Sequence, residues 1–298
     1  MTGYIEHADI PYAQPVGNAH LLDVYVPATG EGPFPAVLFH GGSAFRSDNT
    51  KRNPGAAPDL ARRWVPEGFV VVGFNVRSSG QAVFPAQVHD VKAAIRHLRA
   101  NAATYRLDPD RLATMGTSSG GWVATMAGVT ASVPDLEGDL GNPGQRSDVQ
   151  AVVDLFGPTD FLQMDAHRIQ GGMLHDPADS PESALMGFPI QSDPEAVQRA
   201  NPAAYVGAAS PPIFICHGMQ DPAVPCHQSE LLFAAYEKAG ASATLALVHA
   251  AEHTDAYLEA DEEERTVLQT SGGRTTRGST PAPTYETLLS FLRDTLGV

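Results

Sequence analysis

Short apolar runs alternate with helix-like segments along most of the chain. The pattern predicts buried strands at residues 35–39, 69–74, 111–115, 149–156, 212–216 and 243–248. An earlier antiparallel strand is expected at 20–26. Residues 85–105 carry apolar side chains at three- and four-residue spacing, the period of an amphipathic crossover helix, and further helices are expected at 228–238 and 285–296. This alternation predicts an α/β protein with a mostly parallel central sheet and helices on both of its faces.

The polar positions of the crossover helix hold basic residues. Lys92, Arg96 and Arg99 fall on the side opposite its apolar stripe. We therefore expect these three side chains on the exposed face of the helix.

Two segments interrupt the alternation. Residues 157–205 are rich in Pro, Gly, Asp and Met, hold only short helical stretches and are too long for a plain connection, so we expect a lid over an active site. Residues 261–283 begin with an acidic run and continue in Thr, Ser, Gly and Arg, which predicts a mobile, solvated loop. From the length of 298 residues and the composition, we expect residues 1–298 to form a single domain.

Charge and composition narrow the range of partners. The formal net charge of -15 disfavours nucleic acid and anionic membranes, whose phosphates would repel the surface. No apolar stretch approaches the length of a membrane span, and residues 1–20 lack the basic start and apolar core of an export signal, so a cytoplasmic location is expected. Cys216 and Cys226 have no metal-ligand spacing; we expect two free thiols rather than a disulfide, and no metal.

The most informative motif is Gly116-Thr117-Ser118-Ser119-Gly120. It follows a predicted strand and precedes an apolar helix that starts near Trp122. Its small residues stand where a strand-to-helix turn would crowd any larger side chain. The motif therefore predicts a nucleophile elbow with Ser118 at its tip.

A serine hydroxyl is a weak nucleophile near neutral pH, so it needs a neighbouring base and an acid that orients the base. Asp221 follows the strand at 212–216, and His253 lies in the loop after the next strand. Parallel strands end at one edge of a sheet, so these loops should converge on Ser118. His249 is the alternative base, but it falls at the end of a strand, where a side chain packs against neighbouring structure. Asp154 on the preceding strand is the alternative acid, but Asp221 has the better loop context.

The stretch His40-Gly41-Gly42-Ser43 follows another buried strand, and its glycines allow backbone amides to approach a bound oxygen closely. We expect the amides of Gly42, Ser43 and Ser119 to stabilise an oxyanion, and His40 to fix the loop by hydrogen bonding. Apolar side chains near this loop and in the lid are expected to form the substrate pocket. They are Phe45, Trp122, Phe161, Leu162, Met164, Met173 and Met186.

On these residues the chain resembles the α/β-hydrolase superfamily, and within it the acetyl-esterase and hormone-sensitive-lipase-like branch with an HGG oxyanion loop. More narrowly, it is similar to bacterial carboxylesterases grouped with bifunctional feruloyl and acetyl-xylan esterases. That likeness is carried by residues 84–90, 107–111, 156–161, 180–183 and 227–232, and the resemblance covers most of 18–257.

Three positions depart from the pattern of this branch. Ser43 replaces the usual third glycine of the oxyanion loop, and Trp122 stands where a histidine is common after the elbow. The Gly-x-Gly-His pattern usual at the catalytic histidine is here Ala250-Ala251-Glu252-His253. All three departures line or border the expected pocket and leave the catalytic groups in place.

The triad and the oxyanion loop predict a serine carboxylesterase that acts through an acyl-enzyme, with no metal or organic cofactor. An apolar, uncharged pocket under an acidic surface favours neutral short-to-medium acyl or aryl esters as substrates. The expected partner is a small-molecule ester, and the sequence leaves a homodimer open. An arylformamidase or amidase would share the fold and the triad. A non-catalytic binding protein of the same fold would be expected to lose a triad member, and none is missing.

Overall fold

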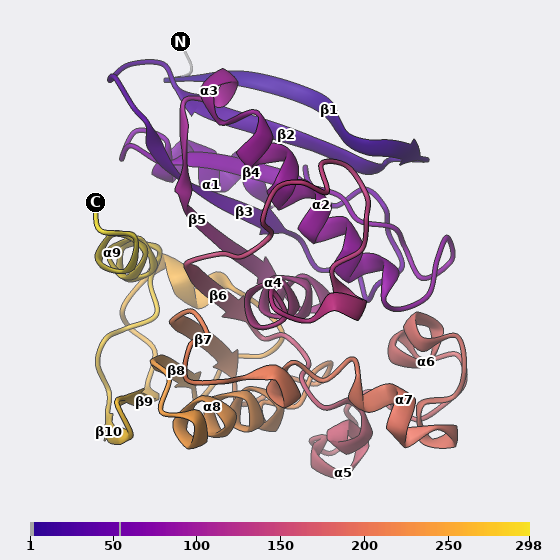
Figure 1. The fold of residues 1–298 in the computed structure, drawn as a ribbon. Coiled ribbons are helices and arrows are strands. Elements are labelled where there is room, and N and C mark those ends of the chain that lie inside the picture. The colour runs from indigo at the N-terminus through magenta and orange to yellow at the C-terminus, as the bar shows by residue number, and fades with distance from the viewer. Residues whose placement is uncertain (1–2, 54) are drawn as a thin grey trace.

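The computed structural model describes residues 3–53 and 55–298; Met1, Thr2 and Pro54, which belong to the expected single domain, lie outside the described residues. Within this range ten strands form one sheet in the order β1-β2-β4-β3-β5-β6-β7-β8-β9-β10 (Figure 1). The strands are β1 (Tyr4–Val16), β2 (Ala19–Pro27), β3 (Phe34–His40), β4 (Val70–Phe74), β5 (Leu107–Thr117), β6 (Ala151–Leu155), β7 (Ile213–Gly218), β8 (Ala243–Val248), β9 (Arg265–Ser271) and β10 (Arg274–Gly278). Every neighbouring pair from β4 to β8 is parallel, and the outer pairs are antiparallel, which confirms the predicted sheet.

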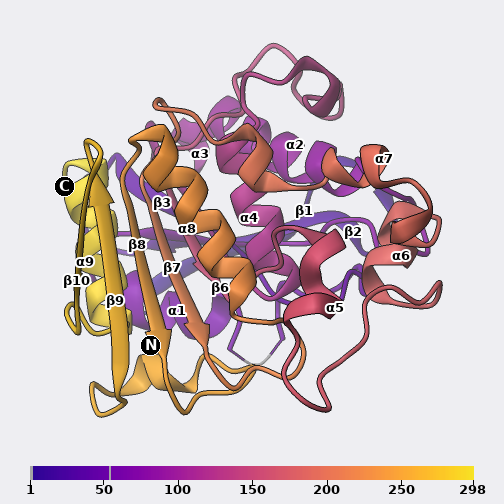
Figure 2. The same cartoon turned by 90° about the horizontal axis from the view of Figure 1, so that it is seen from below.

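Helices cover both faces of the sheet, as Figures 1 and 2 show. Their bounds are α1 (Ala57–Trp64), α2 (Ala86–Ala100), α3 (Ala102–Tyr105), α4 (Ser119–Val129), α5 (Met164–His167), α6 (Pro181–Met186), α7 (Pro194–Gln198), α8 (His227–Ala239) and α9 (Tyr285–Leu296). Apolar side chains of α2, α4 and α8 belong to one core cluster, and those of α1 and α9 belong to the cluster on the opposite face. The α/β class expected from the alternating pattern is therefore confirmed.

The basic side chains of α2 are not exposed, contrary to the sequence-based expectation. Lys92 and Arg96 are both 0% exposed, and their charged ends contact Glu137 at 3.1 Å and 2.5 Å. Arg99 is also buried and donates to backbone carbonyls. The segment around Glu137 covers this side of the helix, and a helical wheel alone does not reveal such a covering segment.

Residues 261–283 are not an irregular loop, and that expectation was wrong. They contain β9 and β10, which form a hairpin on the edge of the sheet, with β9 paired to β8 from Val248–Arg265 to Ala243–Thr270. Gly272 and Gly273 form the turn with φ of 57° and 77°, values that favour glycine. β10 is exposed along its whole length, so polar residues are tolerated there. Thr is also common in strands, and the composition that suggested a solvated loop therefore suits an exposed edge strand equally well.

The segment 157–205 leaves β6 and returns to β7 through the short helices α5, α6 and α7 joined by 3-10 turns, as its composition predicted. These helices lie together beside the sheet in both views (Figures 1 and 2). Cys216 on β7 and Cys226 before α8 are free thiols in the described chain, as expected. Among the residues that the structure describes, no helix combines the length and apolar character needed to cross a bilayer.

Candidate active site

Ser118 stands at the sharp turn between β5 and α4. Its backbone has φ 54° and ψ -126°, a conformation that costs a non-glycine residue strain. The neighbouring glycines are needed because the strand, turn and helix touch: a Cβ on Gly116 would lie 2.1 Å from the Gly120 oxygen, and one on Gly120 would lie 2.0 Å from the His40 oxygen. The predicted elbow conformation is therefore present, with Ser118 at its tip.

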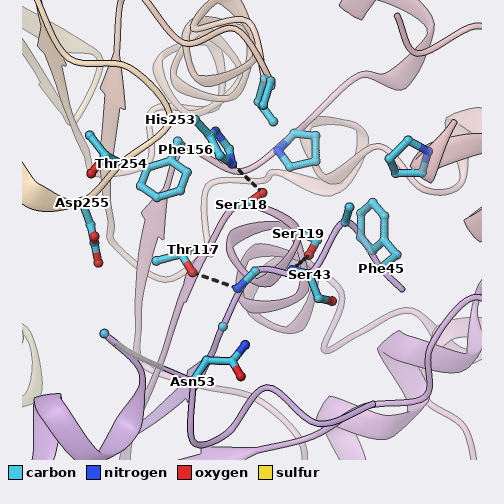
Figure 3. A pocket seen from close by; sticks show the side chains of 18 of the residues that line it. Ser43, Phe45, Asn53, Thr117, Ser118, Ser119, Phe156, His253, Thr254 and Asp255 are labelled. Atoms are coloured by element: carbon cyan, nitrogen blue, oxygen red, sulfur yellow. Dashed lines mark hydrogen bonds between the residues drawn. The ribbon is translucent and has the colours of Figure 1, made fainter. Parts of the chain in front are cut away.

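The three residues predicted to form a triad are hydrogen-bonded in a row. His253 Nε2 lies 3.0 Å from Ser118 Oγ, and His253 Nδ1 lies 2.6 Å from Asp221 Oδ2. Figure 3 shows the bond between Ser118 and His253. The two alternatives lie elsewhere: His249 Nε2 contacts the Thr266 hydroxyl at 3.0 Å, and Asp154 accepts hydrogen bonds from the Thr125 hydroxyl and the Gly157 amide.

Asp221 is held ionised by its surroundings. Its Oδ1 accepts hydrogen bonds from the amides of Ala223 and Val224, both at 2.8 Å, while Oδ2 faces His253 and lies 3.3 Å from His217 Nε2. Burial opposes ionisation, but the hydrogen bonds and charges of His217 and His253 outweigh it and hold the pKa of Asp221 well below its usual range. The carboxylate is thus fixed and negative where it meets His253.

His217 is a supporting residue to which the sequence analysis gave no role. It is 0% exposed, its Nδ1 lies 2.7 Å from the Ser229 hydroxyl, and its Nε2 lies 2.9 Å from the Val224 oxygen. Its position at the end of β7, directly before the loop that carries Asp221, could have indicated this supporting role from the sequence.

The loop predicted to stabilise an oxyanion, residues 40–43, passes against Ser118. A Cβ on Gly42 would lie only 2.7 Å from Ser118 Cβ, so only glycine fits there. The Gly42 amide donates to Thr117 Oγ1 and the Ser43 amide to Ser119 Oγ, each at 2.9 Å (Figure 3). The Ser119 amide belongs to the first turn of α4, where amides have no partner within the helix. The three predicted donors therefore surround Ser118, two of them engaged with neighbouring hydroxyls.

His40 fixes the start of this loop, as expected. Its Nδ1 lies 3.1 Å from the Phe74 oxygen and 3.0 Å from the Thr50 hydroxyl. Burial lowers the pKa of His40 to about 4. The imidazole is therefore neutral near pH 7 and acts as a hydrogen-bonding support within the core.

A cavity of about 480 Å³ opens above Ser118. Its wall combines the oxyanion loop, the elbow, the His253 loop and the 157–205 segment, and includes Gly42, Ser43, Phe45, Thr117, Ser118, Ser119, Phe156, Met173, His175, Glu182, Val224, His253 and Asp255. Phe156 packs edge-to-face on the His253 ring, with centroids 4.7 Å apart. Of the apolar side chains expected in the pocket, Phe45 and Met173 are present in its wall.

The expectation that Trp122, Phe161, Leu162 and Met164 line the pocket was wrong, because none of the four belongs to the cavity wall. Trp122 and Met164 are 0% exposed and Phe161 is 1% exposed. Trp122 packs edge-to-face on Phe45 at 5.4 Å between centroids. These side chains form the core behind Phe45, where the 157–205 segment closes over α4, and Met186 is likewise buried outside the wall.

The cavity also contains polar side chains that the sequence analysis missed. Glu182 and His175 come from the 157–205 segment, and Asp255 follows the His253 loop. Burial raises the pKa of Asp255. Glu182 lies in the stretch 180–183 on which the family likeness rested, and that likeness was the only signal in the sequence that pointed to Glu182.

Across residues 3–53 and 55–298, no group of three or more His, Cys, Asp or Glu side chains is arranged to hold a metal ion.

A serine on a strand-to-helix turn, joined through histidine to aspartate at the carboxyl edge of a mostly parallel sheet, defines the chain as an α/β-hydrolase. The family model described as BD-FAE matches residues 22–236, and the chain belongs to this family.

Comparison with known proteins agrees with this assignment. Over 79% of its length the chain is 34% identical to Esterase LipQ of Mycobacterium tuberculosis and covers 53% of that protein. The chain spans about half the length of the curated relatives it matches.

Two solved structures are also similar. A truncated carbohydrate esterase from gut microbiota superposes with a TM-score of 0.83 at 31% identity, covering 100% of this chain and 98% of that one. A bifunctional GH43-CE protein of Bacteroides eggerthii superposes with a TM-score of 0.82 at 32% identity, covering 98% of this chain and 35% of that one. These findings confirm the predicted resemblance to the esterase branch of the α/β-hydrolases.

Proposed function

We propose that the chain is a serine carboxylesterase. The observation that carries this proposal is the hydrogen-bonded row of Ser118, His253 and Asp221, of which Ser118 and His253 line a cavity. The relatives support it, because LipQ is named an esterase and one similar structure is that of a carbohydrate esterase.

In the first half-reaction, Ser118 Oγ attacks the ester carbonyl carbon while its proton passes to His253 Nε2. Asp221 accepts the hydrogen bond from His253 Nδ1 and stabilises the imidazolium that forms. The tetrahedral intermediate then collapses, and His253 gives the proton to the departing alkoxide, so the alcohol leaves and an acyl-serine remains. In the second half-reaction, water attacks the acyl carbon with His253 as base, and the acid is released.

The negative oxygen of each intermediate is stabilised by the amides of Gly42, Ser43 and Ser119. Two of these amides donate to the hydroxyls of Thr117 and Ser119. A neutral hydroxyl is a weaker acceptor than an oxyanion, so transfer of these donors to the substrate is more favourable in the transition state than in the ground state. Such differential binding is what accelerates the reaction.

The cavity wall indicates the class of ester. Phe45, Phe156, Met173 and Val224 give it apolar surface, and its volume of about 480 Å³ is of the size usual for small-molecule sites. We propose neutral esters with short-to-medium acyl chains or aryl groups as substrates.

Hydrolysis of p-nitrophenyl acetate, butyrate and octanoate should be measured beside an anilide and N-formylkynurenine. The proposal expects ester turnover that falls at least about 10³-fold in Ser118→Ala and His253→Ala. His249→Ala is the matched control and should retain activity, because His249 is bonded to Thr266 rather than to the triad. Hydrolysis of N-formylkynurenine alone would indicate an arylformamidase, and binding without any turnover would indicate a non-catalytic protein.

A further inference from the structure

A carboxylate and an imidazole that the ester chemistry does not use share the cavity with Ser118. Glu182 stands in the first turn of α6 and His175 in the loop before it, and both belong to the cavity wall. They are 3% and 1% exposed, and His175 Nδ1 lies 2.8 Å from Glu182 Oε2. A buried, hydrogen-bonded pair of this kind is costly to form, so its position in the pocket calls for a reason.

The pair is held rigidly in place. The Asp165 carboxylate accepts a hydrogen bond from the His175 amide at 2.7 Å, and the Ser180 hydroxyl caps α6 by accepting from the Ser183 amide at 3.0 Å. The Met173 amide donates to the Pro222 oxygen at 2.7 Å, next to Asp221 in the chain. The wall that carries Glu182 is therefore tied to the loop that carries the catalytic acid.

One oxygen of Glu182 has no hydrogen-bond partner among the residues that the structure describes. Oε2 accepts from His175, whereas Oε1 forms no hydrogen bond with any residue in 3–53 or 55–298. Glu182 lines the cavity and this oxygen keeps contact with solvent, so it is free to accept a hydrogen bond from a group that enters the cavity.

The charge of the pair indicates which donor suits it. Burial lowers the pKa of His175, but the hydrogen bond and charge of Glu182 and the charge of Asp165 outweigh this effect, so the pKa of His175 is raised above its usual value. This direction favours the charged form of the imidazole, which offsets the carboxylate charge across the 2.8 Å contact. An acceptor oxygen whose charge is partly offset favours a neutral hydroxyl over a cation.

We propose that Glu182 is a specificity-determining residue, whose Oε1 accepts a hydrogen bond from a hydroxyl group of the ester substrate, with His175 as its positioning residue. This inference rests on the proposed function. The hydroxyl can belong to the alcohol part or to the acyl part of the ester, and matched substrates distinguish these two sources.

The test compares kcat/KM for pairs of esters that differ in hydroxyl groups. Propyl butyrate against glycerol 1-monobutyrate probes the alcohol side, and methyl butyrate against methyl 4-hydroxybutyrate probes the acyl side. The wild type should prefer the hydroxylated member of one pair. In Glu182→Gln, turnover of that member should fall about tenfold further than turnover of its plain partner, mainly through KM, since a charged acceptor is replaced by a neutral amide whose oxygen and NH2 group must also serve His175.

The matched control is Glu195→Gln, which changes an exposed carboxylate of the same segment and should leave both ratios unchanged. A second variant tests the charge argument independently of Glu182→Gln. His175→Asn removes the group beside Glu182 that can carry the offsetting charge, so turnover of butyrylcholine relative to glycerol monobutyrate should rise several-fold, an effect that a merely structural role would not produce.

The proposal is overturned if the wild type prefers neither hydroxylated ester, if it prefers butyrylcholine to both, or if Glu182→Gln slows the members of each pair equally. Turnover of the plain esters tests the proposed function separately: their hydrolysis without a hydroxyl preference removes the role of Glu182 and leaves the esterase proposal intact.

Discussion

Replacing Asp221 by Asn should reduce kcat/KM for a good ester about 10⁴-fold while leaving the chain folded. The Asn side-chain oxygen can still accept from the amides of Ala223 and Val224, which hold Asp221 Oδ1 at 2.8 Å. The Asn amide group then faces His253 Nδ1, where Asp221 Oδ2 lies at 2.6 Å. Two donors cannot share this position, so the ring must place its proton on Nε2.

That tautomer points an N–H group at Ser118, and His253 can no longer accept the serine proton. The imidazolium also loses its counter-charge in the transition state. A loss of about 10⁴ corresponds to about 5.5 kcal/mol of transition-state stabilisation at 1.36 kcal/mol per tenfold. The assay is the pH dependence of kcat/KM for p-nitrophenyl butyrate, with thermal unfolding as a check on folding.

Asp154→Asn is the matched control for this experiment. Asp154 is also a buried aspartate near the elbow, but its hydrogen bonds run to Thr125 and Gly157. We expect this variant to keep its activity within about tenfold of the wild type, because it leaves the triad untouched. The reasoning is refuted if Asp221→Asn loses less than about tenfold, or if Asp154→Asn loses as much as Asp221→Asn.

Three other predictions follow from the contacts of the site. Gly42→Ala should lower kcat about 10²-fold, because its Cβ would come within 2.7 Å of Ser118 Cβ and displace the oxyanion loop; steady-state kinetics would show this, and unchanged kcat would contradict it. Phe45→Ala should cost about 3–5 kcal/mol in the free energy of unfolding by urea, because Phe45 is only 5% exposed; a cost below about 1 kcal/mol would refute its packing role. The lowered pKa of Asp221 stabilises the fold above the unfolded value of about 3.9, and this contribution is lost as pH falls through the folded pKa. His217→Ala should raise that pKa, so urea midpoints should begin to fall at a higher pH than in the wild type; an unchanged acid limb would contradict this.

Much of the fold could be predicted from the sequence because the buried strands are continuous apolar runs, and the exposed edge strands lack such runs. The strand at 243–248 and the helix at 285–296 were predicted with the bounds that the structure shows. The edge strands were not predicted. β1 is mostly exposed, contains Pro11 and lacks an apolar run, and β9 depends on pairing with β8. Such strands are stabilised by a neighbour far away in sequence, and composition does not reveal that neighbour.

The contact between Ser118, His253 and Asp221 was predictable because topology alone brings the ends of parallel strands together. The pocket wall was not, because it depends on how the 157–205 segment folds back. Trp122 was expected to meet substrate, but the same segment covers it and its Nε1 donates to the Ala200 oxygen at 2.8 Å. Glu182 and His175 were missed for a related reason: their chemistry arises from a contact within that segment, and the segment has no regular hydrophobic period to indicate which side chains face inward.

The central claim is that His253 and Asp221 make the Ser118 hydroxyl reactive. The most direct measurement is the rate at which a fluorophosphonate labels the intact chain, with the modified residue identified by mass spectrometry of its peptides. We predict a single adduct on Ser118 whose formation slows at least about 10³-fold in His253→Ala, and no adduct in Ser118→Ala. Labelling of another residue, or equally fast labelling of Ser118 without the imidazole, would contradict the claim.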